Sequence, residues 1–188
     1  MRNIIEEYFK VVSKNFLNLN DEIDNIQEAT NIILNALKNK NKIIFCGNGG
    51  SAADSQHLAA ELLGRYKFDR DPLPAISLTV DTSAITAIAN DYRYDDIFSR
   101  QLEGLGNKND VLFCMSTSGN SKNVIKAIDT AKKLDIKIIS LTGINDSEMS
   151  KKSDVCIKAP SSETNNIQEM HIAIGHLICG IIEEEIFA

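Results

Sequence analysis

The sequence has no cluster of basic residues. Its 188 residues carry a formal net charge of -6, and its lysines and arginines are scattered along the chain. Neutralising nucleic-acid phosphates requires clustered Lys and Arg, so this composition argues against a general nucleic-acid surface. A single sugar phosphate needs only local positive potential and remains compatible with the sequence.

Long apolar runs are also lacking. The longest, IAIGHLICGII, is about half the ~20 residues that a membrane-spanning helix requires, and a histidine and two glycines interrupt it. Near the start of the chain, Glu6 and Glu7 stand where a secretion signal would need an apolar stretch. We therefore expect a cytoplasmic protein with neither a leader nor a membrane partner.

Cysteine is sparse and widely spaced. The four residues are Cys46, Cys114, Cys156 and Cys179, and the first three lie in strand-like apolar runs. This spacing suits neither a disulfide framework nor a zinc knuckle, so we expect all four to act as small buried hydrophobic residues.

No linker, internal repeat or low-complexity segment divides the chain. With 43% hydrophobic residues, 188 residues suit one well-packed domain and are too few for two typical ones. The sequence therefore predicts one domain over residues 1–188.

Two amphipathic helices are expected at the N-terminus. Ile5, Tyr8, Phe9, Val12 and Phe16 recur at helical spacing, and a second helical pattern runs through residues 23–37. Residue 21, an aspartate, is a suitable cap for the second helix. Both apolar stripes are broad, so a partner subunit is plausible.

From residue 42 the pattern changes to repeated strand and helix segments. The short apolar runs are KIIFCG, AISLTV, DVLFCMS, KIISLTG and DVCIKAP. Near-continuous apolar strands separated by helices predict a parallel sheet buried on both faces, hence a doubly wound α/β fold with five strands. A helical pattern of over twenty residues follows, starting at Thr164 as a fair N-cap, and predicts a long C-terminal helix.

Ligands of open parallel sheets bind where strands end and helices begin, so these junctions are the first candidates for a site. The segment FCGNGGSAAD follows the first strand, and its glycines would let backbone N–H groups approach an anion, with Asn48 and Ser51 as side-chain donors. Gly47, Gly49 and Ala52 also fit the G-x-G-x-x-A pattern of dinucleotide sites. The acidic residue expected about 20 positions later is absent. A tight turn without a ligand is the third alternative.

The segment MSTSGNSKNVIKAI follows the third strand and opens another helix. Its hydroxyl donors are Ser116, Thr117, Ser118 and Ser121. A helix cap requires one hydroxyl and this loop offers four, which favours a phosphate cradle over simple capping. Lys122 fits either a role in the cradle or a solvated surface position.

Polar pairs stand in two further places. Asn90 and Asp91 are suited to holding sugar hydroxyls, although in isolation they indicate only a turn. His57 and Glu61 lie four residues apart on the helix that the glycine loop opens, so they share one face. That spacing suits a metal ion or one substrate atom, and equally a surface ion pair.

Gln168, His171 and His176 stand out within the apolar C-terminal helix. A lone helical histidine is more often structural than functional. Gln168 and His176 are about 12 Å apart along the helix axis and roughly 80° apart around it. If both belong to one kind of site, the simplest geometry has different subunits contributing them.

Taken together, these motifs resemble the sugar isomerase (SIS) domain family, and most closely its bacterial sedoheptulose 7-phosphate isomerases. GNGGSAADSQHLAAELLGRY, DTSAITAIANDY, DDIFSRQLEGLG, STSGNSKNVIKAI and NIQEMHIAIGH occur in the family's order and spacing. The resemblance spans the chain. It implies a flavodoxin-like five-stranded SIS domain, a homotetramer with sites at subunit interfaces, and one zinc ion per subunit.

The resemblance also implies a reaction, the conversion of sedoheptulose 7-phosphate to D-glycero-D-manno-heptose 7-phosphate for lipopolysaccharide or capsule. The implied substrate-binding residues are Asn48, Gly49, Gly50, Glu61, Asn90, Asp91, Ser116, Thr117, Ser118, Ser121 and Gln168. The implied zinc ligands are His57, Glu61, Gln168 and His176. Glu61 would take the carbon-bound proton and His176 would move the oxygen-bound proton, while zinc polarises the carbonyl.

Two positions depart from the family pattern. Arg93 stands where a glycine is frequent, and Asn165 stands where some members carry aspartate, so Asn165 is left out of the site. Non-catalytic SIS proteins that act as tetrameric scaffolds share the two loops but lack the glutamate and the final histidine, whereas this chain has Glu61 and His176. A nucleotide-dependent oxidoreductase would need the missing ribose-binding acid.

Overall fold

Five parallel strands form the centre of the molecule, which we describe from a computed structural model covering residues 1–188. The strands are β1 (Ile43–Gly47), β2 (Ala75–Ser77), β3 (Val111–Met115), β4 (Lys137–Gly143) and β5 (Val155–Ala159). Their order across the sheet is β2-β1-β3-β4-β5, and every neighbouring pair is parallel. The predicted five-stranded parallel sheet is confirmed, although β2 is shorter than its apolar run.

Alternation along the strands divides the core into two halves. In β1, Ile43 and Phe45 face one layer of helices, while Ile44 and Cys46 face the other. All five residues of β1 and all five of β3 are buried. Burial on both faces is the reason that these strands are continuously apolar rather than alternating with polar residues.

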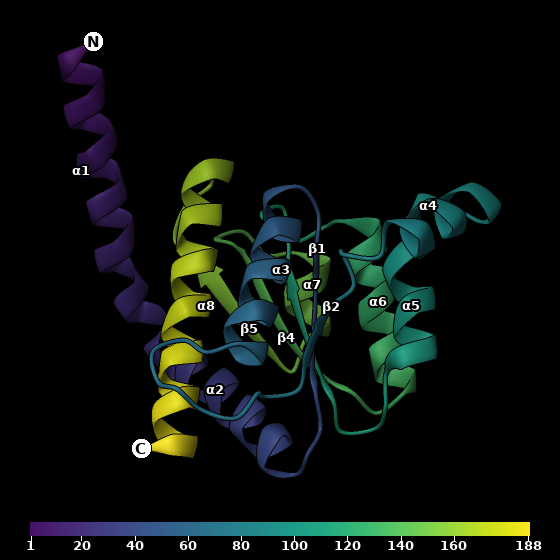
Figure 1. Ribbon diagram of the computed structural model, residues 1–188. Helices are drawn as coiled ribbons and strands as arrows, with labels where there is room; N and C mark the ends of the chain where they lie inside the picture. Colours follow the sequence, from purple (N-terminus) through teal and green to yellow (C-terminus); the bar gives the residue numbers. More distant parts are fainter.

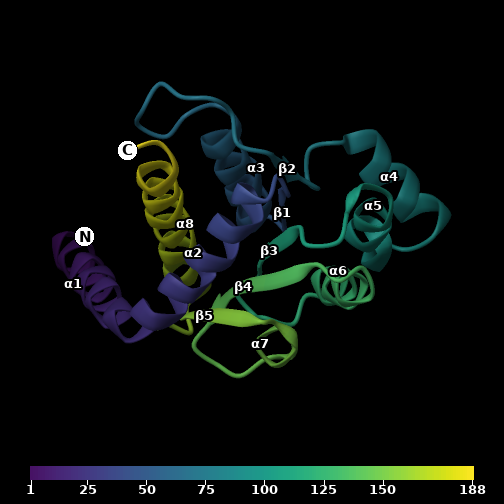
Figure 2. The same ribbon diagram turned by 90° about the horizontal axis from the view of Figure 1, so that it is seen from below.

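Helices cover both faces of the sheet, as Figure 2 shows. One face carries α2 (Ile23–Lys38), α3 (Gly50–Leu63) and α8 (Thr164–Phe187). The other face carries α4 (Thr82–Asp91), α5 (Ile97–Leu105), α6 (Lys122–Lys133) and α7 (Glu148–Lys152). This arrangement is the predicted doubly wound fold with its long C-terminal helix (Figure 1).

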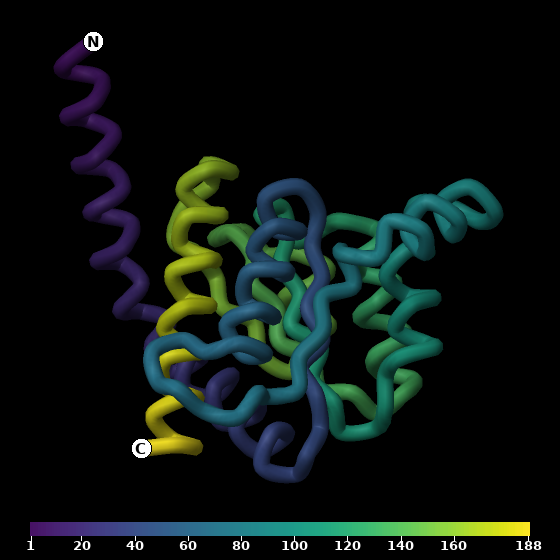
Figure 3. Tube along the Cα trace, in the orientation of Figure 1, coloured from purple at the N-terminus to yellow at the C-terminus, as the bar shows by residue number.

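The first helix, α1 (Arg2–Asn18), projects away from the sheet, as the trace in Figure 3 shows. None of its residues is buried, and Ile5, Phe9 and Leu17 are at least half exposed. The Tyr8 hydroxyl donates a hydrogen bond to the Glu169 carboxylate of α8. The apolar stripe predicted for α1 therefore exists, and most of it faces solvent in the single chain.

Both predicted helix caps are wrong. Asp21 lies within a short 3-10 turn (Leu19–Glu22), and Glu22 precedes α2 without a capping side-chain hydrogen bond. Thr164 is the first residue of α8 rather than its cap, because the chain turns helical one residue earlier than predicted. Helix boundaries commonly differ by a residue or two from any pattern-based assignment.

Each cysteine carries a free thiol, and three of the four are buried. Burial raises the pKa of Cys46 and of Cys179 to about 12, so both thiols stay protonated. The expected structural role of the cysteines is consistent with this. None of the helices has the length and apolar character needed to cross a bilayer.

Candidate active site

Two loops meet at the carboxyl edge of the sheet because they follow neighbouring strands. β1 and β3 pair in register from Ile43 with Val111 to Gly47 with Met115, so the loops after them start side by side. The amides of Asn48 and Asn123 join the loops, since each donates to the other's oxygen at 2.9 and 2.8 Å. The Tyr94 hydroxyl also donates to the Asn48 oxygen at 3.0 Å. Asn48 is thereby held in place from two sides.

Gly49 gives the first loop its shape. Its φ is 57°, in the left-handed region that favours glycine, and it immediately precedes α3. A Cβ at Gly49 would meet no atom within 4 Å, so the space in front of this backbone is open. The N–H groups of Ser51, Ala52 and Ala53 bond to the carbonyls of Asn48 and Gly49. The positive end of the α3 dipole still faces this open space, which suits an anion.

Three serine hydroxyls of the second loop lie close together. Ser116 Oγ lies 2.9 Å from Ser121 Oγ and 3.3 Å from Ser118 Oγ. Ser121 is the N-cap of α6, but its side chain makes no capping hydrogen bond. The capping explanation for this serine-rich loop is therefore wrong for Ser121, and its hydroxyl joins the cluster.

Asn90 and Asp91 lie apart from this cluster within one chain. They are the last two residues of α4, which sits at the outer margin of the molecule in Figure 1. Both are exposed, and the Asn90 amide donates to Asp91 at 2.9 Å. Their only side-chain hydrogen bond in the structure is this one between neighbours.

Facing side chains of α3 and α8 form the most distinctive part of the site. The two helices run in the same direction, since Asp54 contacts Gln168 and, further along both helices, His57 contacts His176. His57 Nε2 lies 2.8 Å from His176 Nε2 and 3.2 Å from a Glu61 carboxylate oxygen. The donor atoms of these three residues all lie within 4.8 Å of one another. Such a group is able to hold a metal ion or to exchange protons with a ligand.

The structure brings His57, Glu61 and His176 together within one chain, because α3 and α8 are parallel neighbours. Gln168 is not part of this group, since its amide bonds to Asp54 instead. The expectation that different subunits bring Gln168 and His176 to one site therefore stays a prediction.

Gln168 lies near the N-terminal ends of α3 and α8. Its amide donates to both carboxylate oxygens of Asp54, at 2.8 and 3.0 Å, and a Cβ on Gly50 would lie 3.3 Å from its Cγ. Gln168 therefore links the glycine loop to the facing helices. Partial burial raises the pKa of Asp54, while the Gln168 hydrogen bond and the charges of His57 and His176 lower it less.

The two histidines of α8 have different surroundings. His171 is fully buried and donates from Nε2 to the Thr142 carbonyl at 3.1 Å. Burial lowers its pKa to about 4, partly offset by that hydrogen bond, so the ring is neutral at pH 7. His171 is thus structural, as is usual for a lone helical histidine, while His176 faces the candidate site.

Several residues of the site were not predicted. Asp54 falls three residues before His57 on the same helix face, a spacing that is visible in the sequence alone. Tyr66 places its ring 6.0 Å from the His176 ring, and Asn123 and Tyr94 fix Asn48. No local pattern marks Tyr66, Tyr94 or Asn123, because only the packing of distant segments brings them to the site.

The chain matches known proteins over its whole length. The SIS domain family model matches residues 7–143. A phosphoheptose isomerase of Akkermansia muciniphila is 50% identical over 187 residues, covering 100% of this chain and 99% of that protein. One from Helicobacter pylori strain P12 is 54% identical over 158 residues, covering 84% of this chain and 82% of the relative.

Solved structures of similar proteins agree with this assignment. The phosphoheptose isomerase of Neisseria gonorrhoeae superposes with a TM-score of 0.92 at 39% identity, covering 97% of this chain and 98% of that one. The enzyme of Francisella tularensis gives a TM-score of 0.93 at 35% identity, with 97% of both chains covered. The chain therefore belongs to the SIS domain family, in its phosphoheptose isomerase branch.

Proposed function

We propose that this chain is an aldose–ketose isomerase that converts D-sedoheptulose 7-phosphate to D-glycero-D-manno-heptose 7-phosphate. The single observation that carries the proposal is the convergence of His57, Glu61 and His176 on helices that start from the open carboxyl edge of the sheet. The names of the relatives supply the substrate class, a heptose phosphate, and the geometry supplies groups suited to its isomerisation. The product would feed heptose synthesis for lipopolysaccharide or capsule.

Substrate binding is assigned to the two loops and to the facing helices. The phosphate would sit among the hydroxyls of Ser116, Thr117, Ser118 and Ser121, and its charge suits the N-terminus of α6. The sugar chain would extend along the backbone of Asn48, Gly49 and Gly50 toward α3 and α8. Contacts from Glu61 and Gln168, and from Asn90 and Asp91, complete the proposed set.

The reaction moves one proton between adjacent carbons and another between their oxygens. Glu61 would abstract the proton from C1 of the ketose and return it to C2, passing through an enediol. His176 would carry the proton between the two oxygens. The side chain of Glu61 is about four-fifths buried, so it would meet the substrate largely away from bulk water.

The donor set also fits a zinc ion. Two imidazole nitrogens and a carboxylate oxygen are typical ligands of catalytic zinc sites, which keep a further position open. We assign His57, Glu61 and His176 of one chain as ligands, with one ion per subunit. Because Gln168 lies about 12 Å from His176 along α8, the fourth ligand would be the amide oxygen of Gln168 from a second copy of the chain. When bound, such an ion would polarise the substrate carbonyl. Metal analysis of protein purified without chelator tests this part separately.

Self-association forms part of the proposal. The exposed apolar side chains of α1, together with the groove that Ile23, Leu34, Leu177 and Ile181 line between α2 and α8, would be covered in a homotetramer. Asn90 and Asp91, peripheral in one chain, would then be able to reach a neighbouring copy's site. We further propose that residues 1–188 act as one SIS domain in the cytoplasm, without nucleic-acid or membrane partners.

The test is direct. Purified protein is incubated with sedoheptulose 7-phosphate, and aldose formation is followed by NMR. Steady formation of the aldose supports the proposal. Binding of the sugar phosphate without turnover would instead support a non-catalytic SIS protein and would refute the isomerase assignment.

A further inference from the structure

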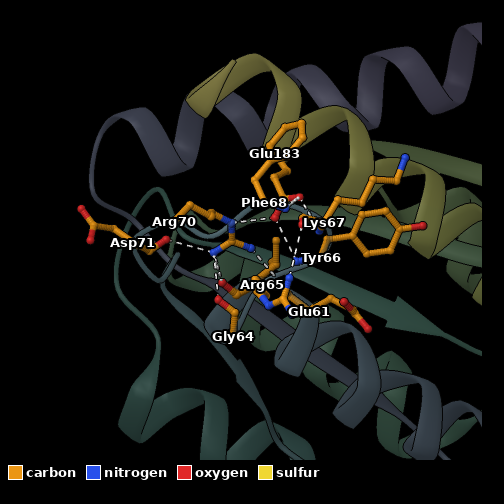
Figure 4. Close-up of polar contacts among 10 residues, drawn as sticks. Glu61, Gly64, Arg65, Tyr66, Lys67, Phe68, Arg70, Asp71 and Glu183 are labelled. Carbon is orange, nitrogen blue, oxygen red and sulfur yellow. Dashed lines mark hydrogen bonds and ion pairs between the residues drawn. The ribbon is translucent and has the colours of Figure 1, made fainter.

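A buried ion pair joins the ends of the two helices that carry the candidate catalytic groups. Arg70, in the segment after α3, donates from Nε to a Glu183 carboxylate oxygen of α8 at 2.9 Å. The two side chains are 2% and 1% exposed. Figure 4 shows them together with the loop that they hold, residues 64–71, and we call this pair the Arg70–Glu183 clasp.

Glu183 organises the backbone of that loop. Its two oxygens accept hydrogen bonds from the backbone N–H groups of Tyr66 at 2.9 Å, Lys67 at 2.5 Å and Phe68 at 2.8 Å, in addition to the bond from Arg70. Burial raises the pKa of this carboxyl, but those hydrogen bonds outweigh burial and lower the pKa to about 2. Glu183 is therefore ionised at neutral pH and fixes three consecutive residues of the loop.

Arg70 organises the end of α3. Its guanidinium donates to the carbonyl of Glu61 at 2.8 Å and to that of Leu62 at 2.8 Å, and it also reaches the carbonyls of Gly64 and Asp71. The last carbonyls of a helix lack partners within the helix, and a cation there also suits the helix dipole. One of the carbonyls that Arg70 holds belongs to Glu61, the residue assigned as the base.

The clasp also fixes an aromatic wall of the site. Tyr66, whose N–H is held by Glu183, lies with its ring tilted 31° to the His176 ring at 6.0 Å. The same ring packs near Gly180, where a Cβ would approach it to 3.1 Å. His176 is therefore placed between His57 and a tyrosine whose backbone the clasp holds.

Burying two charges is costly, and apolar residues of similar size often stabilise a fold as well or better. An apolar pair would not satisfy three loop N–H groups and four carbonyls at once. We propose that Arg70 and Glu183 are positioning residues that set the distance between Glu61 on α3 and His176 on α8. This inference rests on the proposed isomerase function, but it concerns residues outside the proposed substrate and metal ligands.

The test compares three variants with the parent protein. Glu183→Gln keeps the size of the side chain and removes its negative charge. Arg70→Lys keeps the positive charge but replaces the planar guanidinium, with its several N–H donors, by a single ammonium group. Glu184→Gln is the matched control, since Glu184 is exposed and its side chain makes no hydrogen bond in the structure. All assays are run well below each variant's melting temperature, with folding checked by circular dichroism. Arg70→Lys serves as the milder variant if Glu183→Gln does not fold.

We expect kcat for the isomerisation to fall about 10- to 100-fold in both clasp variants, because small displacements of catalytic groups cost factors of this order. KM should change less than about threefold, because the clasp contacts neither the serine loop nor Asn48. The control should match the parent. A folded clasp variant with unchanged kcat, or with a raised KM alone, would overturn the inference.

A second readout does not depend on turnover. The chain has three histidines, so imidazole NMR signals are few and assignable. We expect the ring signals of His57 and His176 to shift in both clasp variants, while the signal of His171 stays in place. In Glu184→Gln, all three histidine signals should match those of the parent protein. If the parent protein does not isomerise the sugar, the proposed function fails, yet these signals still test the clasp. Unchanged signals in a folded clasp variant would refute it.

Discussion

The buried histidine of α8, His171, is expected to make the stability of this protein depend on pH. An unfolded histidine titrates near its ordinary pKa of 6.5, whereas in the folded chain burial lowers the pKa of His171 to about 4. Between these values the unfolded state binds more protons than the folded state, so acid favours unfolding. The contribution is fully present above the unfolded pKa and is lost as the pH falls toward about 4.

The size of the effect follows from the gap between the two pKa values. At about 1.4 kcal/mol per pH unit, the full loss is about 3 kcal/mol. Roughly 2 kcal/mol of it should be lost between pH 7 and pH 5, before most carboxylates titrate. His171→Gln should remove this part of the dependence, since a glutamine amide can donate to the Thr142 carbonyl in place of Nε2 without titrating.

Urea unfolding followed by circular dichroism at several pH values measures the effect. The parent protein should lose about 2 kcal/mol more than His171→Gln between pH 7 and pH 5, and other titrating groups cancel in the comparison. Equal losses in the two proteins would show that His171 is not held neutral by burial, and the reasoning would fail.

Three further predictions concern the proposed site. Glu61→Gln should lower kcat by about 10²- to 10⁴-fold with little change in KM, measured by steady-state kinetics, and a fall in affinity alone would contradict its role as the base. Gly49→Ala should lower the free energy of unfolding by about 1–2 kcal/mol because of the φ of 57°, and not because of a clash, as no atom lies within 4 Å of the added Cβ. An unchanged melting temperature would argue against the described backbone. Ser116→Ala should raise KM about tenfold and weaken inhibition by inorganic phosphate to a similar extent, because it removes a hydrogen bond to a charged group; unchanged phosphate inhibition would place the anion elsewhere.

The sheet and its helices were predictable because their signals are local. Each buried strand is a short apolar run, and each crossover helix repeats its apolar residues at helical spacing. Caps were less predictable, since Asp21 and Thr164 are good capping residues that the folded chain does not use as caps. Both helices start within two residues of the predicted cap, and helix boundaries are the least reliable part of a pattern-based assignment.

The candidate site was predictable in its residue types but not in its geometry. The glycine and serine loops follow from strand order, since neighbouring strands of a parallel sheet end at one edge. The spacing within α8 separates Gln168 from His176. Only the parallel packing of α3 against α8 shows that Gln168 contacts Asp54 and that His176 contacts His57. Arg70 and Glu183 are 113 residues apart, so no pattern within a window joins them.

The central claim is that Glu61 moves a proton between two carbons of the sugar, and running the reaction in deuterated water tests it most directly. NMR of the product from sedoheptulose 7-phosphate should show deuterium at C2 in the fraction of turnovers in which the proton on Glu61 exchanges with solvent. Glu61→Gln should form almost no product under the same conditions. Equal product from Glu61→Gln and the parent protein, whatever its deuterium content at C2, would contradict the account.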